Sequence, residues 1–295
     1  MKWMKGTFLL LAANILIMVT LSLTVPLLIN IVLPMFGVDL RGSVDLSSLV
    51  WALVLGFGGA FISLAFSKQM ARAMLDCRQI TQPQSHAEQV VYGSVQEIAQ
   101  RLHITMPEVW VYESADPNAF ATGPSKNNSM VAVSTGLLTH LQEQEVRAVL
   151  AHEMGHVYNG DMFATTVLAG LMNTFVYYIS MWVRRFFAER DQAMLGFGLS
   201  IVLQIIVSVL ASVLISWFSR QREYGADAFA AKVYGKDSMI SALRAIDRWV
   251  TRSQIEYSSQ DALATMKISG NSSGFMHLFA THPPIEARID ALNRL

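Results

Sequence analysis

Long apolar blocks alternate with stretches of mixed polarity along the chain. The block from Thr7 to Val32 holds no charged residue and exceeds the roughly 20 residues that a helix needs to cross a bilayer. A second block runs from Leu49 to Phe66, and two more run from Met162 to Val183 and from Met194 to Phe218. Because each block is long enough to cross the hydrocarbon as a helix, the pattern predicts four membrane spans.

The first two blocks have the features of a retained membrane anchor. A cleaved signal peptide would have an apolar region of only about 7–15 residues, followed by a small-residue cleavage site. The first block is longer, and the residues after Pro26 continue as LLINIVL rather than as a polar start. In the second block, Gly56, Gly58 and Gly59 favour close packing against another helix.

Basic residues outside the blocks predict the orientation of the chain. The connector between the first two blocks, Gly37 to Ser47, contains Arg41 as its only basic residue. The outer flanks of the same two blocks contain Lys2, Lys5, Lys68, Arg72 and Arg78. Since lysine and arginine accumulate on the cytoplasmic side of membrane proteins, the N-terminus and the chain after Lys68 are predicted to be cytoplasmic.

The third and fourth blocks leave two arrangements open. Threonines, Asn173 and two tyrosines dilute the third block, and the connector Arg184 to Gln192 carries three arginines, which opposes its translocation. The two blocks therefore form a hairpin that either crosses the bilayer or is partly buried in the cytoplasmic domain. We favour the hairpin across the bilayer.

Outside the apolar blocks the pattern predicts a mostly helical α+β domain with a small β-sheet. Apolar residues recur at helical spacing from Val90 to Leu102, whereas two short valine-rich segments alternate as strands do. The predicted strands are Glu108 to Tyr112 and Met130 to Ser134, and the predicted helices are Pro83 to Leu102, Gln142 to Tyr158, Arg222 to Tyr234, Ser238 to Trp249 and Pro284 to Arg294.

These patterns divide the chain into four parts. Residues 1–78 form a two-span anchor with cytoplasmic ends, and residues 79–161 form the first part of a cytoplasmic domain. Residues 162–218 form the apolar hairpin, and residues 219–295 form the second part of the cytoplasmic domain.

The segment His152-Glu153-Met154-Gly155-His156 is the main chemical signal in the sequence. Residues four apart share one face of a helix, so both imidazoles can reach a single ion, with Glu153 beside them. Zinc lowers the pKa of a bound water to about 7, and a carboxylate can then take its proton. The same five-residue pattern also occurs by chance, as two ordinary histidines on the surface of an amphipathic helix.

A zinc hydrolase uses three protein ligands, so a third ligand must come from elsewhere in the chain. Glu223 is the candidate, and Asp227 lies one helical turn further on, where a carboxylate can accept the free N–H of a ligating histidine. The competing interpretations are a solvated glutamate near Arg220 and Arg222, and a surface aspartate. If the ligands meet, the chain between His156 and Glu223 crosses the membrane an even number of times, as two apolar blocks allow.

Composition excludes several other kinds of protein. The 22 basic and 22 acidic side chains cancel, so nothing indicates a nucleic-acid partner, which would need a basic face. Charged residues make up 15% of the chain, against about 25% in a soluble domain. The single cysteine, Cys77, excludes an internal disulfide and a cysteine-rich metal site, so any zinc must be held by histidine and carboxylate.

Four segments together carry a resemblance to a known family: DPNAFATG, HEMGH, SRQREYGADAFAAK and THPPIEAR. In combination they resemble the HtpX family of bacterial membrane heat-shock peptidases, which is related to the CAAX prenyl endopeptidases. The resemblance extends from the N-terminal anchors to the last helix. It implies a zincin-like protease domain at the cytoplasmic face of the cell inner membrane, with one zinc ion per chain.

The resemblance also implies roles for individual residues around the ion. Zinc would be ligated by His152, His156 and Glu223. Glu153 would be the general base, and Asp227 would support a ligating histidine from behind. Two further residues stay open: Arg288 either supports the same site or flanks a helix, and Asp161 either supports a ligand or belongs to a helix-end turn.

Substrate contacts follow from the resemblance in the same way. The segment Asn118, Ala119, Phe120 and Ala121 matches an edge strand that lines the cleft and pairs with the substrate backbone. The alternative is a turn followed by a core phenylalanine. His282 matches the histidine of a His-Pro-Pro motif that would stabilise the oxyanion, and its alternative role is to cap the last helix.

The function implied by the resemblance is cleavage of misfolded or damaged membrane proteins at cytoplasmic segments, as part of a stress response. The partners would be polypeptide substrates and the lipid bilayer. One alternative is a CAAX-type protease for prenylated peptides, but four spans are too few for the multi-span chamber that this would imply. Another is a non-catalytic membrane adaptor on a peptidase fold, against which the intact Glu153 and the full ligand set argue.

Overall fold

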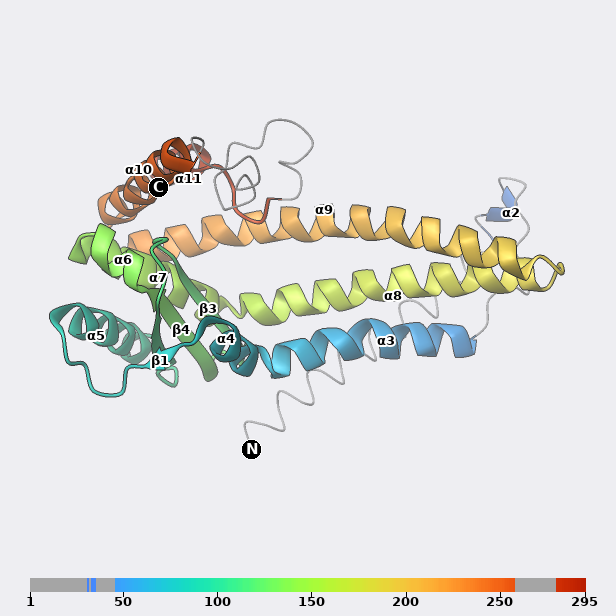
Figure 1. The fold of residues 1–295 in the computed structure, drawn as a ribbon, viewed down its shortest axis with the longest axis horizontal. Helices are drawn as coiled ribbons and strands as arrows, with labels where there is room; N and C mark the ends of the chain where they lie inside the picture. Colours follow the sequence, from blue (N-terminus) through green and yellow to red (C-terminus); the bar gives the residue numbers. More distant parts are fainter. Residues whose placement is uncertain (1–30, 32, 36–45, 258–279) are drawn as a thin grey trace. The chain divides into compact units, whose positions relative to one another are not determined.

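The computed structural model describes residue 31 and residues 33–35, 46–257 and 280–295 (Figure 1). Except for Ile31, the predicted first span therefore lies outside the described residues. Most of the connector that follows it also lies outside them.

The chain divides into two compact units, each assembled from separate stretches of sequence. One unit comprises Met1–Ile62 and Thr166–Ser212, and the other comprises Ser63–Thr165 and Val213–Leu295. All the chemical motifs identified in the sequence belong to the second unit.

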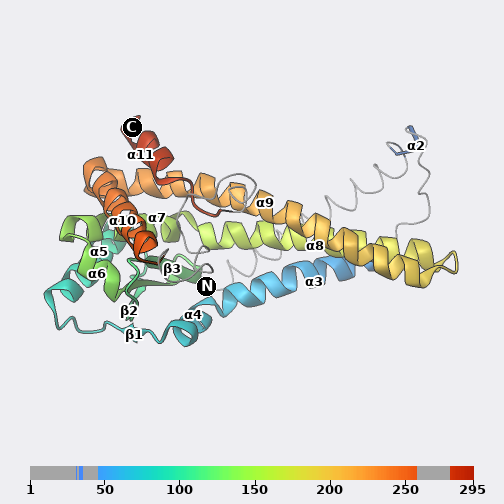
Figure 2. The same ribbon diagram turned by 45° about the horizontal axis from the view of Figure 1, so that its top comes forward.

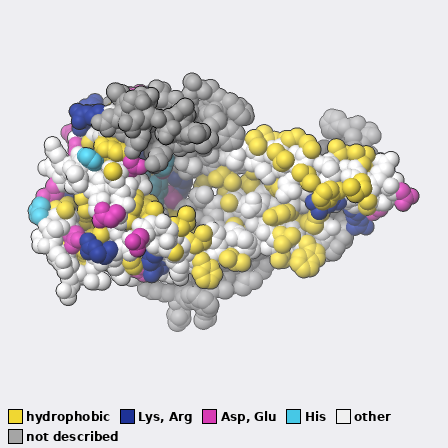
Figure 3. Space-filling view, viewed as in Figure 1, with side chains coloured by type: hydrophobic (Ala, Val, Ile, Leu, Met, Phe, Trp, Pro, Cys, Tyr) yellow, Lys and Arg dark blue, Asp and Glu magenta, His cyan; other side chains and the backbone are white. Residues whose placement is uncertain are grey.

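Long apolar helices build the first unit. They are α3 (Leu46–Ala65), α8 (Asp161–Ala188) and the first part of α9 (Ala193–Tyr234), preceded by the short α2 (Leu33–Met35). By length and composition, α3, α8 and α9 are each able to cross a membrane. These three helices run side by side (Figures 1 and 2), and apolar side chains gather over α8 and α9 on the face seen in Figure 3.

Close packing between α3 and α8 depends on a small residue. A Cβ on Gly56 would lie 2.4 Å from the Oγ1 atom of Thr174, so only glycine fits there. Gly58 and Gly59, which the sequence also suggested for helix packing, have no such neighbour within 4 Å among the described residues. The apolar side chains in this contact are Leu49, Leu53, Phe57, Phe61, Val167, Leu171 and Tyr178.

The described part of the second unit contains a four-stranded sheet, with strand order β1-β2-β4-β3. The strands are β1 (Arg78–Gln79), β2 (Glu108–Tyr112), β3 (Ala119–Ser125) and β4 (Asn128–Ser134). β2 and β4 are parallel, and the other two pairs are antiparallel. The two valine-rich strands predicted from the sequence are confirmed as β2 and β4, whose branched side chains suit a pleated surface.

Helices accompany this sheet in the second unit, and all of them except α4 contribute side chains to its main core. They are α4 (Ser67–Leu75), α5 (His86–Arg101), α6 (Thr135–His140), α7 (Glu143–Asn159), α10 (Lys236–Tyr257) and α11 (Ile285–Asn293). Val91, Val95 and Ile98 of α5 are buried in the same cluster as Val109 and Val131 of the sheet, as their helical spacing predicted.

α10 continues eight residues past the predicted end at Trp249. The polar stretch after Tyr257 lies outside the described residues up to residue 279.

α9 is one continuous helix where the sequence predicted an apolar span followed by a separate helix. The predicted gap, Ser219-Arg220-Gln221, contains neither glycine nor proline, so nothing in it breaks a helix. The polar residues mark a change of environment along the helix rather than its end. Glu223 is therefore part of the same helix as the fourth apolar block.

Candidate metal centre

Helix α7 places both histidines of the HEMGH segment on one face. The helix begins where the Glu145 side chain accepts a hydrogen bond from the Gln142 backbone N at 2.8 Å, and it ends at Gly160, which has a φ of 71°. The Nε2 atoms of His152 and His156 lie 3.1 Å apart. The two rings therefore converge, as helical spacing predicted.

Glu223 of α9 joins the two histidines. Its Oε2 atom lies 3.5 Å from His152 Nε2, and its Oε1 atom lies 3.3 Å from His156 Nε2. One ligand atom from each of the three residues lies within 4.8 Å of the others, and Glu223 is buried. The structure thus contains the convergence of two imidazoles and a distant carboxylate on which the sequence-based prediction depended.

A glycine that the sequence analysis did not single out permits this convergence. A Cβ on Gly155 of α7 would lie 3.3 Å from the Cα of Ala226 and 3.2 Å from the Cδ1 of Phe229, both in α9. These distances are shorter than ordinary van der Waals contacts, so a larger side chain would push α9 away. The glycine is visible inside the motif, but its purpose depends on a helix about 70 residues further along the chain.

Carboxylates hold the remaining nitrogen of each imidazole. His152 Nδ1 lies 2.8 Å from Asp227 Oδ1, and His156 Nδ1 lies 2.7 Å from Asp161 Oδ2. When each Nδ1–H donates to its carboxylate, each Nε2 carries a lone pair. These lone pairs and the Glu223 carboxylate repel one another unless a cation lies between them, so the donor set fits a zinc ion.

An arginine from α11 completes the support of His152. Arg288 is buried and donates from Nε to Asp227 Oδ2 at 2.8 Å and from Nη2 to Asp227 Oδ1 at 2.6 Å. Its Nη1 atom also lies 3.4 Å from Glu223 Oε2. This two-pronged pair balances the buried charge of Asp227, a contact that the sequence analysis left open.

Burial and neighbouring charges shift the ionisation of the site. Burial raises the pKa of the Glu153 carboxyl above its ordinary value, and the charges of His152 and His156 oppose this. For His152, burial disfavours the charged form, but Asp227 and Glu223 hold its pKa above the usual range. The pKa of His156 is raised in the same way, against burial, by Glu223 and Glu153. The site thus favours positive charge at the ligand position.

His282 reaches the same carboxylate from the segment that precedes α11. Its Nδ1 atom lies 2.8 Å from Glu223 Oε2, while 57% of its side chain is exposed. The N-cap of α11 is Pro284. His282 thus contacts the ligand set and still faces solvent.

The segment that the sequence assigned to substrate binding begins the edge strand β3. Asn118 donates from its backbone N to Ser134 Oγ and from Nδ2 to Tyr112 Oη, both at 2.9 Å. Ala119 to Ala121 then pair with β4. Among the described strands β3 has β4 as its single partner, so its other edge can accept an added strand. α7 packs against β3 (Figure 1), which brings this edge to the helix that carries the histidines.

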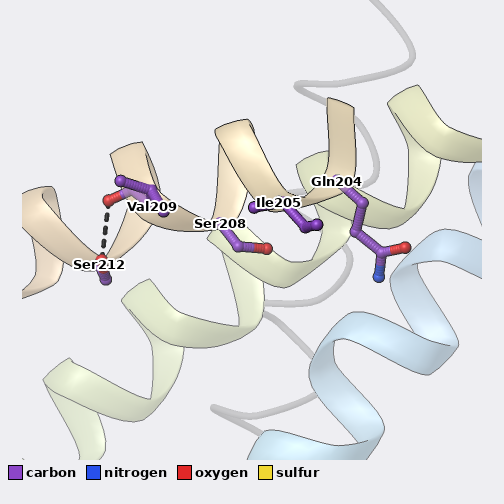
Figure 4. A pocket seen from close by; sticks show the side chains of 5 residues that line it. All are labelled: Gln204, Ile205, Ser208, Val209 and Ser212. Atoms are coloured by element: carbon purple, nitrogen blue, oxygen red, sulfur yellow. Dashed lines mark hydrogen bonds between the residues drawn. The ribbon is translucent and has the colours of Figure 1, made fainter. Parts of the chain in front are cut away.

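A separate groove of about 410 Å³ runs along α9 in the first unit (Figure 4). Its lining residues are Gln204, Ile205, Ser208, Val209 and Ser212. It contains none of the predicted site residues and no ionisable side chain, so it is not a candidate active site.

Known proteins resemble the chain over nearly its whole length. Residues 85–295 match the family described as Peptidase family M48. Protease HtpX of Idiomarina loihiensis is 43% identical over 296 residues, and the match covers 99% of each chain. Protease HtpX of Tolumonas auensis is 42% identical over 302 residues, with 99% of this chain and 100% of the relative covered.

The fold also resembles a solved structure at lower sequence identity. The crystal structure of Ste24p from S. mikatae matches with a TM-score of 0.58 and 18% identity, covering 98% of this chain and 67% of that chain. This likeness concerns the fold.

The match to the peptidase family, the matches to Protease HtpX along nearly the whole chain, and the zinc-binding group of His152, His156 and Glu223 agree with one another. The chain is therefore a zinc metallopeptidase that belongs to peptidase family M48 and, within it, to the HtpX proteases.

Proposed function

We propose that this metallopeptidase is anchored in the inner membrane with its catalytic residues in the cytoplasm, where it cleaves misfolded or damaged membrane proteins. The observation that carries the proposal is the convergence of His152, His156 and Glu223 beside Glu153. Among the residues that the structure describes, three helices are able to cross a membrane. The relatives named Protease HtpX support the protease activity, and the class of substrate is the one that the family resemblance implies.

Glu153 is the proposed general base. When bound, zinc supplies a Lewis acid that polarises the scissile carbonyl and makes a nearby water more acidic. The Glu153 carboxylate accepts the proton of the attacking water and returns it to the leaving nitrogen. Because burial raises the pKa of Glu153, the carboxyl holds this proton more readily between the two steps.

His282 is the proposed donor to the oxyanion of the tetrahedral intermediate. A hydrogen bond aimed at the position where negative charge develops lowers the barrier. The Nδ1 atom of His282 faces the Glu223 carboxylate, which can only accept. The imidazolium form, with a proton on both nitrogens, is therefore the form in which Nε2 donates to the substrate. Its exposure allows it to contact a peptide that lies against the site.

The substrate backbone is proposed to extend the sheet beside β3. Main-chain hydrogen bonds from the free edge at Ala119 to Ala121 would hold an extended peptide with little dependence on its sequence. The backbone N and O of Asn118, which begins this segment, are already bonded to Ser134. Asn118 is itself fixed by Ser134 and Tyr112. This mode suits an enzyme whose substrates share an unfolded segment rather than a sequence motif.

Substitution Glu153→Gln tests the proposal most directly. The glutamine keeps the size of the side chain but cannot accept a proton, so cleavage of casein by the purified full chain should fall by roughly 10²–10⁴-fold. The zinc content should remain that of the wild-type protein, because Glu153 is not a ligand. Full activity in this variant, or wild-type cleavage that survives a chelator, would contradict the proposal.

The substrate class needs its own measurement. The protein is reconstituted in liposomes with a membrane protein in folded and destabilised forms, and cleavage of the two is compared. We expect faster cleavage of the destabilised form, in segments outside the bilayer. A prenylated peptide and its unprenylated counterpart should be cleaved alike, and a strong preference for the prenylated peptide would favour CAAX-type processing instead.

A further inference from the structure

Each ligating histidine is held by a carboxylate, and each of these carboxylates is held by an arginine. The first chain of contacts runs from His152 through Asp227 to Arg288. The second runs from His156 through Asp161 to an arginine of α9, Arg222. The sequence alone leaves the role of Asp161 open and identifies Arg222 only as a neighbour of Glu223.

Asp161 is buried, and both of its carboxylate oxygens accept hydrogen bonds from side chains. It is the first residue of α8 and follows Gly160, which ends α7. Its Oδ2 atom accepts from His156 Nδ1 at 2.7 Å, and its Oδ1 atom accepts from Arg222 Nη2. It is only 6% exposed. A residue that served only the turn between two helices would not need a ligating imidazole on one oxygen and a guanidinium on the other.

Arg222 connects the corner between α7 and α8 to the turn of α9 that carries the third ligand. It immediately precedes Glu223 in the chain, and its Nη2 atom also lies 3.4 Å from the backbone O of Asn159. Its guanidinium thus contacts two residues of that corner, Asn159 and Asp161. Through this contact, the position of His156 and the position of Glu223 depend on each other.

We propose that Asp161 and Arg222 act together as a positioning pair for the metal centre. Asp161 holds His156 in the tautomer that carries its proton on Nδ1, which aims the Nε2 lone pair at the ion. Arg222 orients the Asp161 carboxylate, and it holds α9 at the distance that Glu223 requires. The inference rests on the zinc site of the proposed function. Loss of such supporting contacts commonly lowers metal affinity by about 10–100-fold.

Zinc affinity is the measurement that tests the pair. The purified full chain in detergent competes for zinc with a chromogenic chelator, and cobalt absorption bands report the geometry of the ligands. Asp161→Ala should weaken zinc binding by about 10–100-fold and alter the cobalt bands. Arg222→Lys should retain more affinity than Arg222→Ala, because the lysine keeps the charge but not the fork of donors.

Coupling between the two positions separates a pair from two independent residues. Asp161→Asn keeps an oxygen that can accept from His156 but loses the charge that Arg222 needs. Both changes break the same contact. The double variant Asp161→Asn with Arg222→Ala should therefore lose no more zinc affinity than whichever single variant binds zinc less tightly. If the two losses simply add, the proposed pair is wrong. This comparison also tests the coupling between Asp161 and Arg222 if the Asp161→Ala variant does not fold.

Asp237 offers a matched control. It lies in the first turn of α10, shortly after Gly235, which has a φ of 90°, so its local setting resembles that of Asp161. Asp237 is exposed and has no contact with the ligand set. Asp237→Ala should therefore bind zinc as the wild-type protein does.

The outcomes distinguish this inference from the proposed function. A wild-type protein that bound no zinc would contradict the metal centre itself. Wild-type binding combined with unchanged affinity in a folded Asp161→Ala variant would contradict the positioning pair alone.

Discussion

Arg288 illustrates how a single side chain contributes to the site through another residue. It forms two hydrogen bonds with Asp227, which in turn contacts His152. The guanidinium is buried, and burial opposes its charge, yet Asp227 and Glu223 hold its pKa above the ordinary value. The charged pair is therefore maintained out of contact with solvent, where each partner depends on the other.

Substitution Arg288→Ala should destabilise the second unit and weaken zinc binding together. Removing one partner of a buried ion pair leaves the charge of Asp227 uncompensated, which costs about 3–5 kcal/mol of folding free energy. Arg288→Lys keeps the charge but not the two-pronged geometry, so its losses of stability and zinc affinity should be intermediate. Denaturant unfolding followed by tryptophan fluorescence, with zinc content measured in parallel, checks both effects. A wild-type unfolding midpoint in Arg288→Ala would contradict this account.

At the scale of elements, the site depends on how closely α7 and α9 approach. Gly155 is a point of close contact, because a Cβ there would lie only 3.2 Å from Phe229 and 3.3 Å from Ala226 of α9. The two histidines belong to one helix and Glu223 belongs to the other. Helix spacing at this position therefore sets whether three ligands or only two are available.

Substitution Gly155→Val should separate the helices and remove Glu223 from the ligand set. The valine branches would meet Ala226 and Phe229, so we expect a loss of zinc affinity of at least 10-fold, since outer contacts alone cost about that much. Gly225→Val in α9 is the matched control, because a Cβ there meets nothing within 4 Å among the described residues. Zinc titration and helical content by circular dichroism compare the two variants. Equal affinities would show that Gly155 is not the point of contact that matters.

At the scale of the whole molecule, the prediction concerns which side of the membrane each part faces. Because His156 and Glu223 meet, they lie on the same side of the membrane, so the chain between them crosses it an even number of times or not at all. α8 and α9 are joined by a short turn that includes Gln192, and Arg184 Nε donates to Ser200 Oγ at 2.9 Å across this hairpin. The proposed orientation puts the turn outside and the catalytic residues in the cytoplasm.

Single cysteines test this orientation in a Cys77→Ser background. Gln192→Cys marks the turn of the hairpin, and Arg244→Cys marks an exposed position on α10. In spheroplasts a membrane-impermeant maleimide should label the first variant, whereas it should label the second only after lysis. Labelling of Arg244→Cys in intact spheroplasts would reverse the orientation. Protection of Gln192→Cys would favour a hairpin that does not cross the bilayer.

Much of the local structure could be predicted because it depends on residues close together in the chain. The spacing of His152 and His156 follows from helical periodicity alone, and so does the buried face of α5. The apolar blocks are similarly evident, because crossing a bilayer requires a certain length of apolar residues. The need for a third ligand made Glu223 a candidate, the family resemblance implied the same role, and the structure shows it in contact with both histidines.

The tertiary structure decided what depends on residues that are distant in sequence. Asp161, Arg222 and Arg288 are ordinary charged residues until packing places them behind the ligands. Gly155 acquires its role only because α9 passes over it, and α9 continues through a polar stretch that had indicated a boundary. Periodicity reports which face of a helix is buried, but not which partner buries it. Ion pairs and helix contacts depend on that partner, so only the folded chain could specify the outer support of the metal centre.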